Sequence, residues 1–163
     1  MKNNIRIMSR SDAESLVKSG FPENTAVISF CDPMPKPCAE RSEPIDYRGV
    51  CSRAFRVEIH DVDIEVLSDF GLDFDSYFPE AVCLARFISD CVDDGFDIIC
   101  QCEYGQSRSA ACAAAIKEFY DKDGISVFAD YRYYPNQLVF NKLLEALKNN
   151  KELNGGNNNE QCI

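Results

Sequence analysis

A short apolar run that passes through a glycine turn into an alanine-rich segment is the feature that most limits how this chain can fold. The run DIICQ (97–101) is typical of a buried strand, and SAACAAAI (109–116) is typical of a helix that packs closely on a sheet. We expect that helix to span Arg108–Asp121. A strand, a tight turn and a helix in this order aim several backbone N–H groups and the positive end of a helix dipole at one spot, which therefore attracts an anion.

Strands and helices alternate along the rest of the chain. Apolar and β-branched runs predict three further strands, at 3–8, 25–31 and 54–59. Three further helices are predicted. The first has a capping box of Ser11 and Glu14 and ends at Gly20. The second has apolar residues at helical spacing from Tyr77 to Val92, with Pro79 in its first turn, and the third is opened by Pro135. This alternation predicts an α/β fold with a mostly parallel central sheet of about four to five strands, helices on both faces, and a ligand outside the carboxyl ends of the strands.

The length of the chain suits one domain. Its 163 residues contain no stretch that resembles a linker, so we expect one domain over residues 1–150 and a disordered polar tail over 151–163. Residues 32–53, which contain four prolines, are expected to form a long loop.

The charge balance limits the kinds of partner. With 17 basic and 27 acidic residues the net charge is −10, so broad electrostatic binding to nucleic acid or to an anionic membrane is not expected. The sequence has no apolar run long enough to span a membrane, and its first residues lack the apolar core of a signal peptide. We therefore expect a cytoplasmic protein that captures any phosphate locally.

The nine cysteines predict neither a disulfide framework nor a metal site. Several occupy apolar positions in periodic segments, which is typical of small core residues in a reducing compartment. Cys31, Cys38 and Cys51 form no CxxC pair and the chain has one histidine, so no zinc site is expected. Cys100 lies on the same side of its strand as Cys102, but a bridge between them requires local distortion, so we expect Cys100 to be a core residue.

Cys102 and the residues after it combine a thiol with the anion site. A cysteine is nucleophilic as a thiolate, and backbone N–H donors together with a helix N-terminus favour that charged form. Gly105 allows a tight loop, and Arg108 offers a planar fork that matches two oxygens of a phosphate. Ser109 is placed to donate a hydrogen bond to the sulfur. The pattern indicates chemistry on a phosphate group.

The segment CEYGQSRS (102–109) resembles the CX5R(S/T) signature of the protein tyrosine and dual-specificity phosphatases. The resemblance covers residues 54–115, and YYPNQLVFNKLLEAL (133–147) is similar to the C-terminal helix of small bacterial members. It implies a catalytic domain of phosphatase fold and a cysteinyl-phosphate reaction that needs no metal or cofactor. In that reaction Cys102 attacks phosphorus and an aspartic acid protonates the leaving group, while the oxygens are held by Arg108 and by the loop residues Glu103, Tyr104, Gly105, Gln106 and Ser107.

The general acid of this family follows a strand upstream of the cysteine, and Asp61 has that position after the predicted strand 54–59. Asp63 is the second candidate. The spacing from the cysteine is more usual at Asp69, Asp73 and Asp75, but these residues approach the next helix.

Gln101 is a departure from the family pattern, because a histidine usually precedes the cysteine. Glutamine can donate a hydrogen bond but cannot carry a positive charge, so we expect weaker activation of Cys102. This departure leaves a second hypothesis open, a catalytically weak phosphate-binding pseudophosphatase that recognises a phosphorylated partner. A third hypothesis is thiol redox chemistry or sulfur transfer, since such loops also hold anions around a cysteine.

The size of the chain and the composition of its loop indicate the substrate class. The chain lacks room for the extra elements of receptor-type tyrosine phosphatases, so the resemblance implies a compact dual-specificity-like core. Residues 103–107 include no lysine or arginine, unlike the loops of enzymes that accept inositol phosphates. We therefore expect a protein tyrosine or dual-specificity phosphatase that acts on a phosphorylated protein or a small phosphate ester and binds phosphate or sulfate in its loop.

Overall fold

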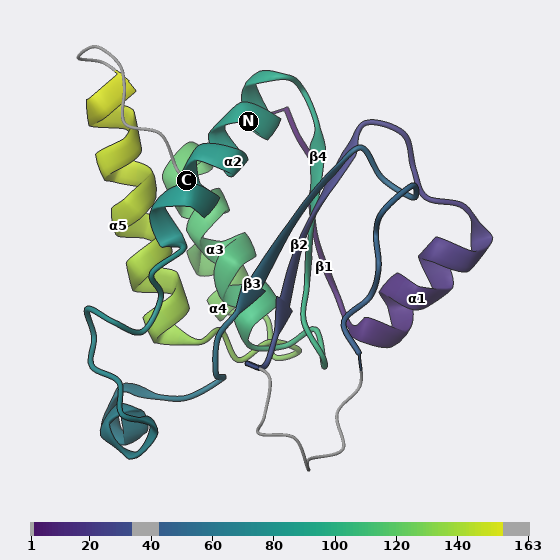
Figure 1. Cartoon of the computed structure of the whole chain (residues 1–163). Coiled ribbons are helices and arrows are strands. Elements are labelled where there is room, and N and C mark those ends of the chain that lie inside the picture. Colours follow the sequence, from purple (N-terminus) through teal and green to yellow (C-terminus); the bar gives the residue numbers. More distant parts are fainter. Residues whose placement is uncertain (1, 34–42, 155–163) are drawn as a thin grey trace.

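A four-stranded parallel sheet forms the centre of the molecule (Figure 1). The structure, a computed structural model, describes residues 2–33 and 43–154. Its strands follow the order β1-β4-β2-β3 and every neighbouring pair is parallel. Their bounds are β1 (Ile5–Met8), β2 (Thr25–Cys31), β3 (Arg53–Glu58) and β4 (Asp97–Gln101). The carboxyl ends of the four strands therefore meet at one end of the sheet.

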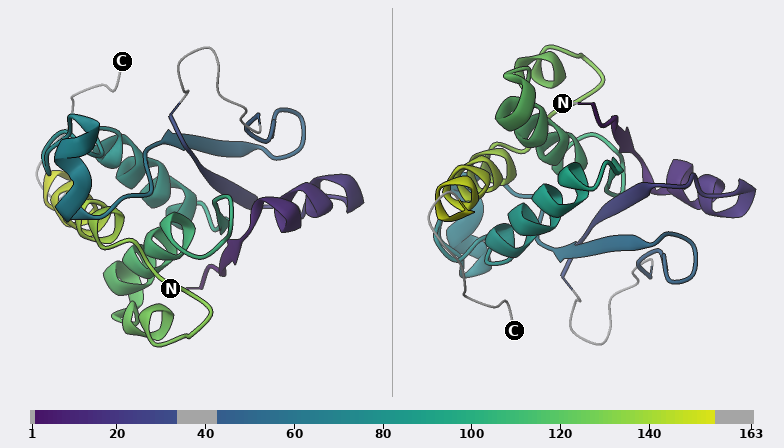
Figure 2. Two further views of the ribbon diagram at one scale, coloured as in Figure 1. Left: turned by 90° about the horizontal axis from the view of Figure 1, so that it is seen from below. Right: turned by 90° about the horizontal axis from the view of Figure 1, so that it is seen from above.

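Helices cover both faces of this sheet (Figure 2). One face is covered by α1 (Arg10–Ser19), and the other by α2 (Ala81–Asp93), α3 (Arg108–Asp121) and α5 (Gln137–Asn154), which pack together. The 3-10 helix η1 (Ile64–Phe70) and the short helix α4 (Ile125–Phe128) lie in connections. The main core lies between the sheet and the three-helix layer, and a smaller core lies on the other face, around Val27 and Ile99.

The predicted α/β fold is confirmed, and the bounds of β2, β4 and α3 are as predicted. β2 is buried along nearly its whole length because it is a central strand covered on both faces. The alanines of α3 are all buried, which allows this helix to lie close to the sheet. Cys100 is a fully buried core residue with a free thiol, as predicted.

The starts of two helices differ from the prediction. α1 begins after Ser9, whose hydroxyl accepts the backbone N–H of Asp12, so the capping box predicted from Ser11 and Glu14 is wrong. Pro79 precedes α2 instead of lying in its first turn. The 3-10 helix η1 and the helix α4 were not predicted.

The two predicted irregular segments are only partly described. The tail was predicted to begin at residue 151, but α5 continues through Asn154, and residues 155–163 lie outside the described residues. In the predicted loop, residues 34–42 also lie outside them, and residues 43–52 form turns without a helix or strand. None of the helices in the described ranges is long and apolar enough to cross a bilayer.

Candidate active site at the end of β4

The loop between β4 and α3 lies at the carboxyl end of the sheet and is held by two other segments. The carbonyl of Glu103 accepts the backbone N–H of Arg10 at 3.0 Å. On the opposite side, the carbonyl of Gln106 accepts the N–H of Tyr134 at 2.9 Å. These bonds fasten the loop to the start of α1 and to the segment that precedes α5.

The backbone N–H groups of the loop are free to bind a ligand. Among the described residues, no acceptor receives a hydrogen bond from the N–H groups of residues 103–108. Gly105 has a left-handed backbone with φ of 69°, and a Cβ at this position would lie 2.6 Å from the backbone nitrogen of Ser9. Successive free N–H groups ahead of a helix N-terminus are the arrangement that binds the oxygens of an anion.

Cys102 lies at the base of this loop. Its side chain is almost fully buried, and its Sγ is 3.0 Å from Oγ of Ser109 in the first turn of α3. At this distance the serine hydroxyl can donate a hydrogen bond to the sulfur. The structure therefore brings together the two residues that the sequence paired.

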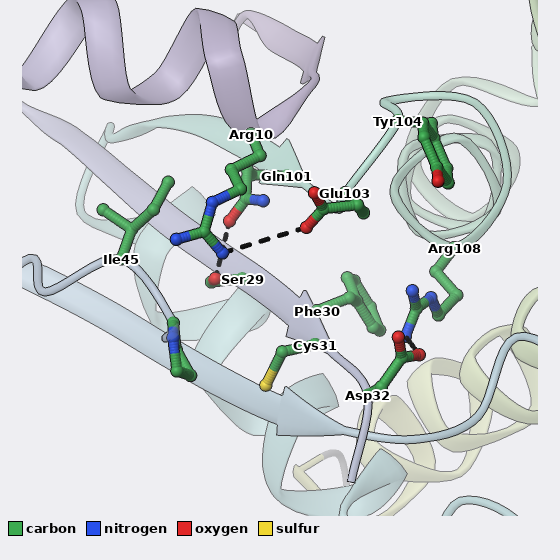
Figure 3. A pocket seen from close by; sticks show the side chains of 11 residues that line it. Arg10, Ser29, Phe30, Cys31, Asp32, Ile45, Gln101, Glu103, Tyr104 and Arg108 are labelled. Carbon is green, nitrogen blue, oxygen red and sulfur yellow. Dashed lines mark hydrogen bonds and ion pairs between the residues drawn. The ribbon is translucent and has the colours of Figure 1, made fainter. Parts of the chain in front are cut away.

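Arg108 is buried and extends toward β2 and β3 (Figure 3). Its Nη1 donates to Oδ1 of Asp32 at 2.8 Å and to the carbonyl of Ile59 at 2.7 Å. Its Nε lies 3.8 Å from Oδ2 of Asp61 and has no hydrogen-bond acceptor in the described part of the chain. A buried guanidinium with an unused donor fits an oxyanion bound beside the loop.

Asp61 follows β3 and contacts the same loop. Its Oδ1 accepts hydrogen bonds from Oγ of Ser107 at 2.6 Å and from Nδ2 of Asn136 at 2.9 Å. Asn136 also donates to the carbonyl of Val62 at 2.9 Å, which holds the backbone next to Asp61. The carboxylate is thus fixed between the loop and the start of α5.

The other candidate carboxylates lie elsewhere. The side chain of Asp63 accepts the N–H of Ile64 at 2.9 Å and caps η1. Asp73 accepts the N–H of Ser76 at 2.8 Å. In the described ranges no hydrogen bond or ion pair joins the loop 102–108 to any of Asp63, Asp69, Asp73 or Asp75.

Gln101 is buried at the end of β4, on the side of the sheet that faces α1. Its Oε1 accepts hydrogen bonds from Oγ of Ser29 at 2.6 Å and from the hydroxyl of Tyr47 at 3.3 Å. Burial raises the pKa of the Tyr47 phenol, which therefore remains a donor at neutral pH. Gln101 anchors the end of β4 to β2 and to the segment before β3 without carrying a charge.

The other side chains of the loop point outward. Glu103, Tyr104 and Gln106 are exposed, and Oε2 of Glu103 lies 3.8 Å from Nη1 of Arg10 (Figure 3). A cavity of about 260 Å³ borders this side of the loop, and its lining includes Arg10, Glu103 and Arg108.

Sequence analysis missed four residues of this site: Ser29, Asp32, Tyr47 and Asn136. Asp32 directly follows the central strand β2, and the rule that ligands bind at carboxyl ends of parallel strands could have found it. The side chain of Asn136 accepts the N–H of Val139 at 3.0 Å and so caps α5. The position of Asn136 directly after Pro135 could have indicated this capping role. Ser29 and Tyr47 carry no comparable signal.

Comparisons with known proteins bear on the fold. No protein-family model and no curated protein matches the chain. The PTP-2 phosphatase of Cydia pomonella aligns with a TM-score of 0.51 at 15% identity, over 89% of this chain and 87% of that one. PTPMT1 in complex with PI(5)P aligns with a TM-score of 0.50 at 14% identity, over 91% of this chain and 93% of that one. The predicted similarity to small bacterial members stays a prediction, whereas the architecture is clear: the chain has the fold of the protein tyrosine and dual-specificity phosphatases.

Proposed function

We propose that this protein is a phosphomonoester hydrolase that works through a cysteinyl-phosphate intermediate, as a protein tyrosine or dual-specificity phosphatase. One observation carries the proposal. The sulfur of Cys102 lies at the start of a loop with free N–H groups, and the unused Nε of Arg108 lies beside that loop, 3.8 Å from the carboxylate of Asp61. This arrangement supports the assignment of Cys102 as nucleophile, the loop N–H groups and Arg108 as oxyanion donors, and Asp61 as proton carrier.

In the first step, the Cys102 thiolate attacks phosphorus and forms an S–P bond while the P–O bond to the leaving group breaks. The loop N–H groups and Nε of Arg108 hold the nonbridging oxygens, which carry the charge in the transition state. Asp61 gives its proton to the leaving oxygen, so the alcohol or phenol departs neutral.

In the second step, a water molecule attacks phosphorus and the carboxylate of Asp61 takes a proton from it. The S–P bond breaks and the sulfur leaves as a thiolate. The hydroxyl of Ser109, 3.0 Å from the sulfur, donates a hydrogen bond to that thiolate. The products are inorganic phosphate and the original enzyme, with Asp61 protonated again.

We favour a phosphorylated protein as the substrate. The PTPMT1 structure, which is similar to this one in fold, contains PI(5)P. In the present chain, the loop contributes the acidic Glu103 and no cationic residue over 103–107, and Asp32 pairs with Arg108 at 2.8 Å. This charge pattern favours a single phosphate over a multiply phosphorylated headgroup. We also propose a cytoplasmic location, where the thiol stays reduced.

A phosphate-binding pseudophosphatase is the second candidate, and Gln101 is the observation that favours it. Its neutral amide stands where the family usually has a histidine, so it adds no positive charge near Cys102. In this case the loop would bind a phosphorylated partner without turnover.

Hydrolysis of para-nitrophenyl phosphate by the wild type and by Cys102→Ser separates the two candidates. We expect turnover by the wild type, none by the serine variant, and retained phosphate binding in both. Mass spectrometry of rapidly quenched Asp61→Asn should detect a covalent phosphate on Cys102. Absence of turnover at saturating substrate, with phosphate still bound, would favour the pseudophosphatase, and absence of phosphate binding would remove both candidates.

A further inference from the structure

A groove opens from the candidate active site on the side of Asp61. It has a volume of about 470 Å³, and Asp61 and Ser107 belong both to its lining and to the hydrogen-bonded site described above. The rest of the lining comes from the two residues after Asp61 and from the stretch that runs from the end of α4 to the start of α5. A peptide with its phosphate in the loop therefore has this groove beside the phosphorylated residue.

The charge that lines the groove is negative and comes from Asp63, and the described lining includes no lysine or arginine. Asp61 also lines the groove, but in the proposed reaction it is protonated when the substrate binds, and its Oδ2 lies 3.8 Å from Nε of the buried Arg108, so it adds no net negative charge. Asp63 uses Oδ1 to cap η1, and its second oxygen has no partner among residues 2–33 and 43–154. The guanidinium of Arg132 lies 5.3 Å from the ring centre of Tyr133, but it is paired with Asp130 at an Nη2–Oδ2 distance of 2.5 Å, so these two charges compensate each other. The groove thus attracts a cation.

Aromatic residues also line the groove. They include Tyr133 and Tyr134, and Tyr134 is 73% exposed. The backbone N–H of Tyr134 is bonded to the carbonyl of Gln106, so this residue lies next to the phosphate loop. An exposed aromatic side chain in the same groove as the Asp63 carboxylate suits a guanidinium, because arginine stacks on a ring while its N–H groups pair with the acid.

The acidic character continues beyond the groove along η1. Glu65 and Asp69 are exposed on this helix, next to the exposed apolar side chain of Ile64. A substrate segment that leaves the groove in this direction meets further negative charge, and acidic residues at the same positions are repelled.

We propose that this groove is a specificity subsite for a basic residue, arginine above all, within a few positions of the phosphorylated residue of a substrate protein. This inference rests on the proposed function, because it assumes that the phosphate of the substrate is bound in the loop. It names the substrate class more narrowly: phosphorylated sites with basic neighbours.

The test compares phosphotyrosine peptides that differ only in flanking residues, which are arginine, lysine, alanine or glutamate. Dissociation constants are measured by fluorescence anisotropy on Cys102→Ser, and kcat/KM is measured on the wild type. We expect the arginine peptide to bind about tenfold more tightly than the glutamate peptide, with lysine in between, and the ratio to shrink as salt is added.

Two variants locate the effect in the groove. Asp63→Asn should reduce the arginine-to-glutamate ratio several-fold, and Tyr134→Ala should remove the advantage of arginine over lysine. Glu145→Gln, which removes an exposed charge on α5, is the matched control and should leave the ratio unchanged.

The outcomes separate the two proposals. Equal dissociation constants for the arginine and glutamate peptides, together with hydrolysis of para-nitrophenyl phosphate, would overturn the subsite and leave the enzyme. A tenfold preference in binding without any hydrolysis would support the subsite and overturn the enzyme. A preference that persists in Asp63→Asn and Tyr134→Ala would also overturn the subsite.

Discussion

The side-chain amide of Asn136 lies 2.9 Å from Oδ1 of Asp61, and this contact ties the start of α5 to the proposed general acid. The same side chain accepts the N–H of Val139 through its oxygen and donates to the carbonyl of Val62. One residue therefore caps a helix and positions a carboxylate from a distant part of the chain. In the described part of the chain no hydrogen bond joins Asn136 to the sulfur of Cys102, so in the proposed reaction Asn136 is a positioning residue.

Replacement of Asn136 by serine should impair proton transfer more than folding. Serine keeps an oxygen that can cap α5 but has no amide to reach Asp61. We expect kcat for an alkyl phosphate to fall roughly tenfold or more, because a misplaced acid protonates a poor leaving group inefficiently. An aryl phosphate with a good leaving group needs little protonation and should be affected much less.

The measurement is kcat over a series of phosphate esters whose leaving groups differ in pKa. Asn141→Ser, at an exposed position in α5, is the control. A uniform decrease across the series would show that Asn136 supports the loop as a whole and does not act through Asp61. Asn136→Ala should in addition lower the free energy of unfolding by about 1 kcal/mol through loss of the cap.

Gly105→Ala should disrupt the phosphate loop. A Cβ there would lie 2.6 Å from the backbone nitrogen of Ser9 and 2.8 Å from the carbonyl carbon of Met8, and φ is 69°. The backbone atoms of Met8 in β1 and of Ser9, which caps α1, cannot move aside without loss of sheet contacts, so both the stability and the affinity for inorganic phosphate should fall.

Gly71→Ala is the matched control for this substitution. Gly71 has a φ of 68° and open space around the Cβ position, so alanine meets only the conformational cost of about 1–2 kcal/mol. Thermal unfolding and phosphate titration of the two variants provide the comparison. Equal decreases in Tm with unchanged phosphate affinity would contradict the close approach between the loop and β1.

Parts of the fold with strong local signals were predictable. β2 and β4 are short runs of mostly apolar residues, and the alanines of α3 are typical of a helix pressed onto a sheet, so their bounds follow from sequence alone. The start of α1 was less clear because Ser9 and Ser11 can both cap a helix. Ser9 directly follows β1, and the position of that strand selects it.

Contacts within the site depend on tertiary structure and were less predictable. The Cys102–Ser109 contact joins residues seven positions apart within one strand–loop–helix unit. The Arg108–Asp32 contact joins residues 76 positions apart, and only the strand order β1-β4-β2-β3 brings them together. Gln101 was recognised as a departure from the family, but its donors Ser29 and Tyr47 come from separate segments whose packing no local pattern reveals.

Gln101→Leu should destabilise the protein, because Ser29 and Tyr47 would lose their hydrogen-bond acceptor. Leucine fills a similar volume but cannot accept the hydrogen bonds of Ser29 and Tyr47, and a buried hydroxyl without an acceptor costs about 1–3 kcal/mol. We expect urea unfolding to show a decrease in this range.

A double variant checks the cause. In the Gln101→Leu background, Ser29→Ala removes the unpaired hydroxyl and should be less destabilising than in the wild type, or even stabilising. Strictly additive effects of the two substitutions would show that the hydrogen bond between these side chains does not support the structure.

Asp61→Asn should separate the two chemical steps. Asparagine keeps the size of the side chain but cannot donate an acidic proton or take one from water, so kcat for an alkyl phosphate should fall by roughly 10²-fold or more. With a good leaving group, the phosphoenzyme should still form while its hydrolysis slows, and stopped-flow traces should show a burst of product followed by a slow steady state. In Asp63→Asn the side-chain oxygen can still cap η1, and kcat should fall at least tenfold less. If Asp63→Asn produced the burst and Asp61→Asn did not, the general acid would be Asp63, and the contacts of Asp61 with Ser107 and Asn136 would have a purely structural role.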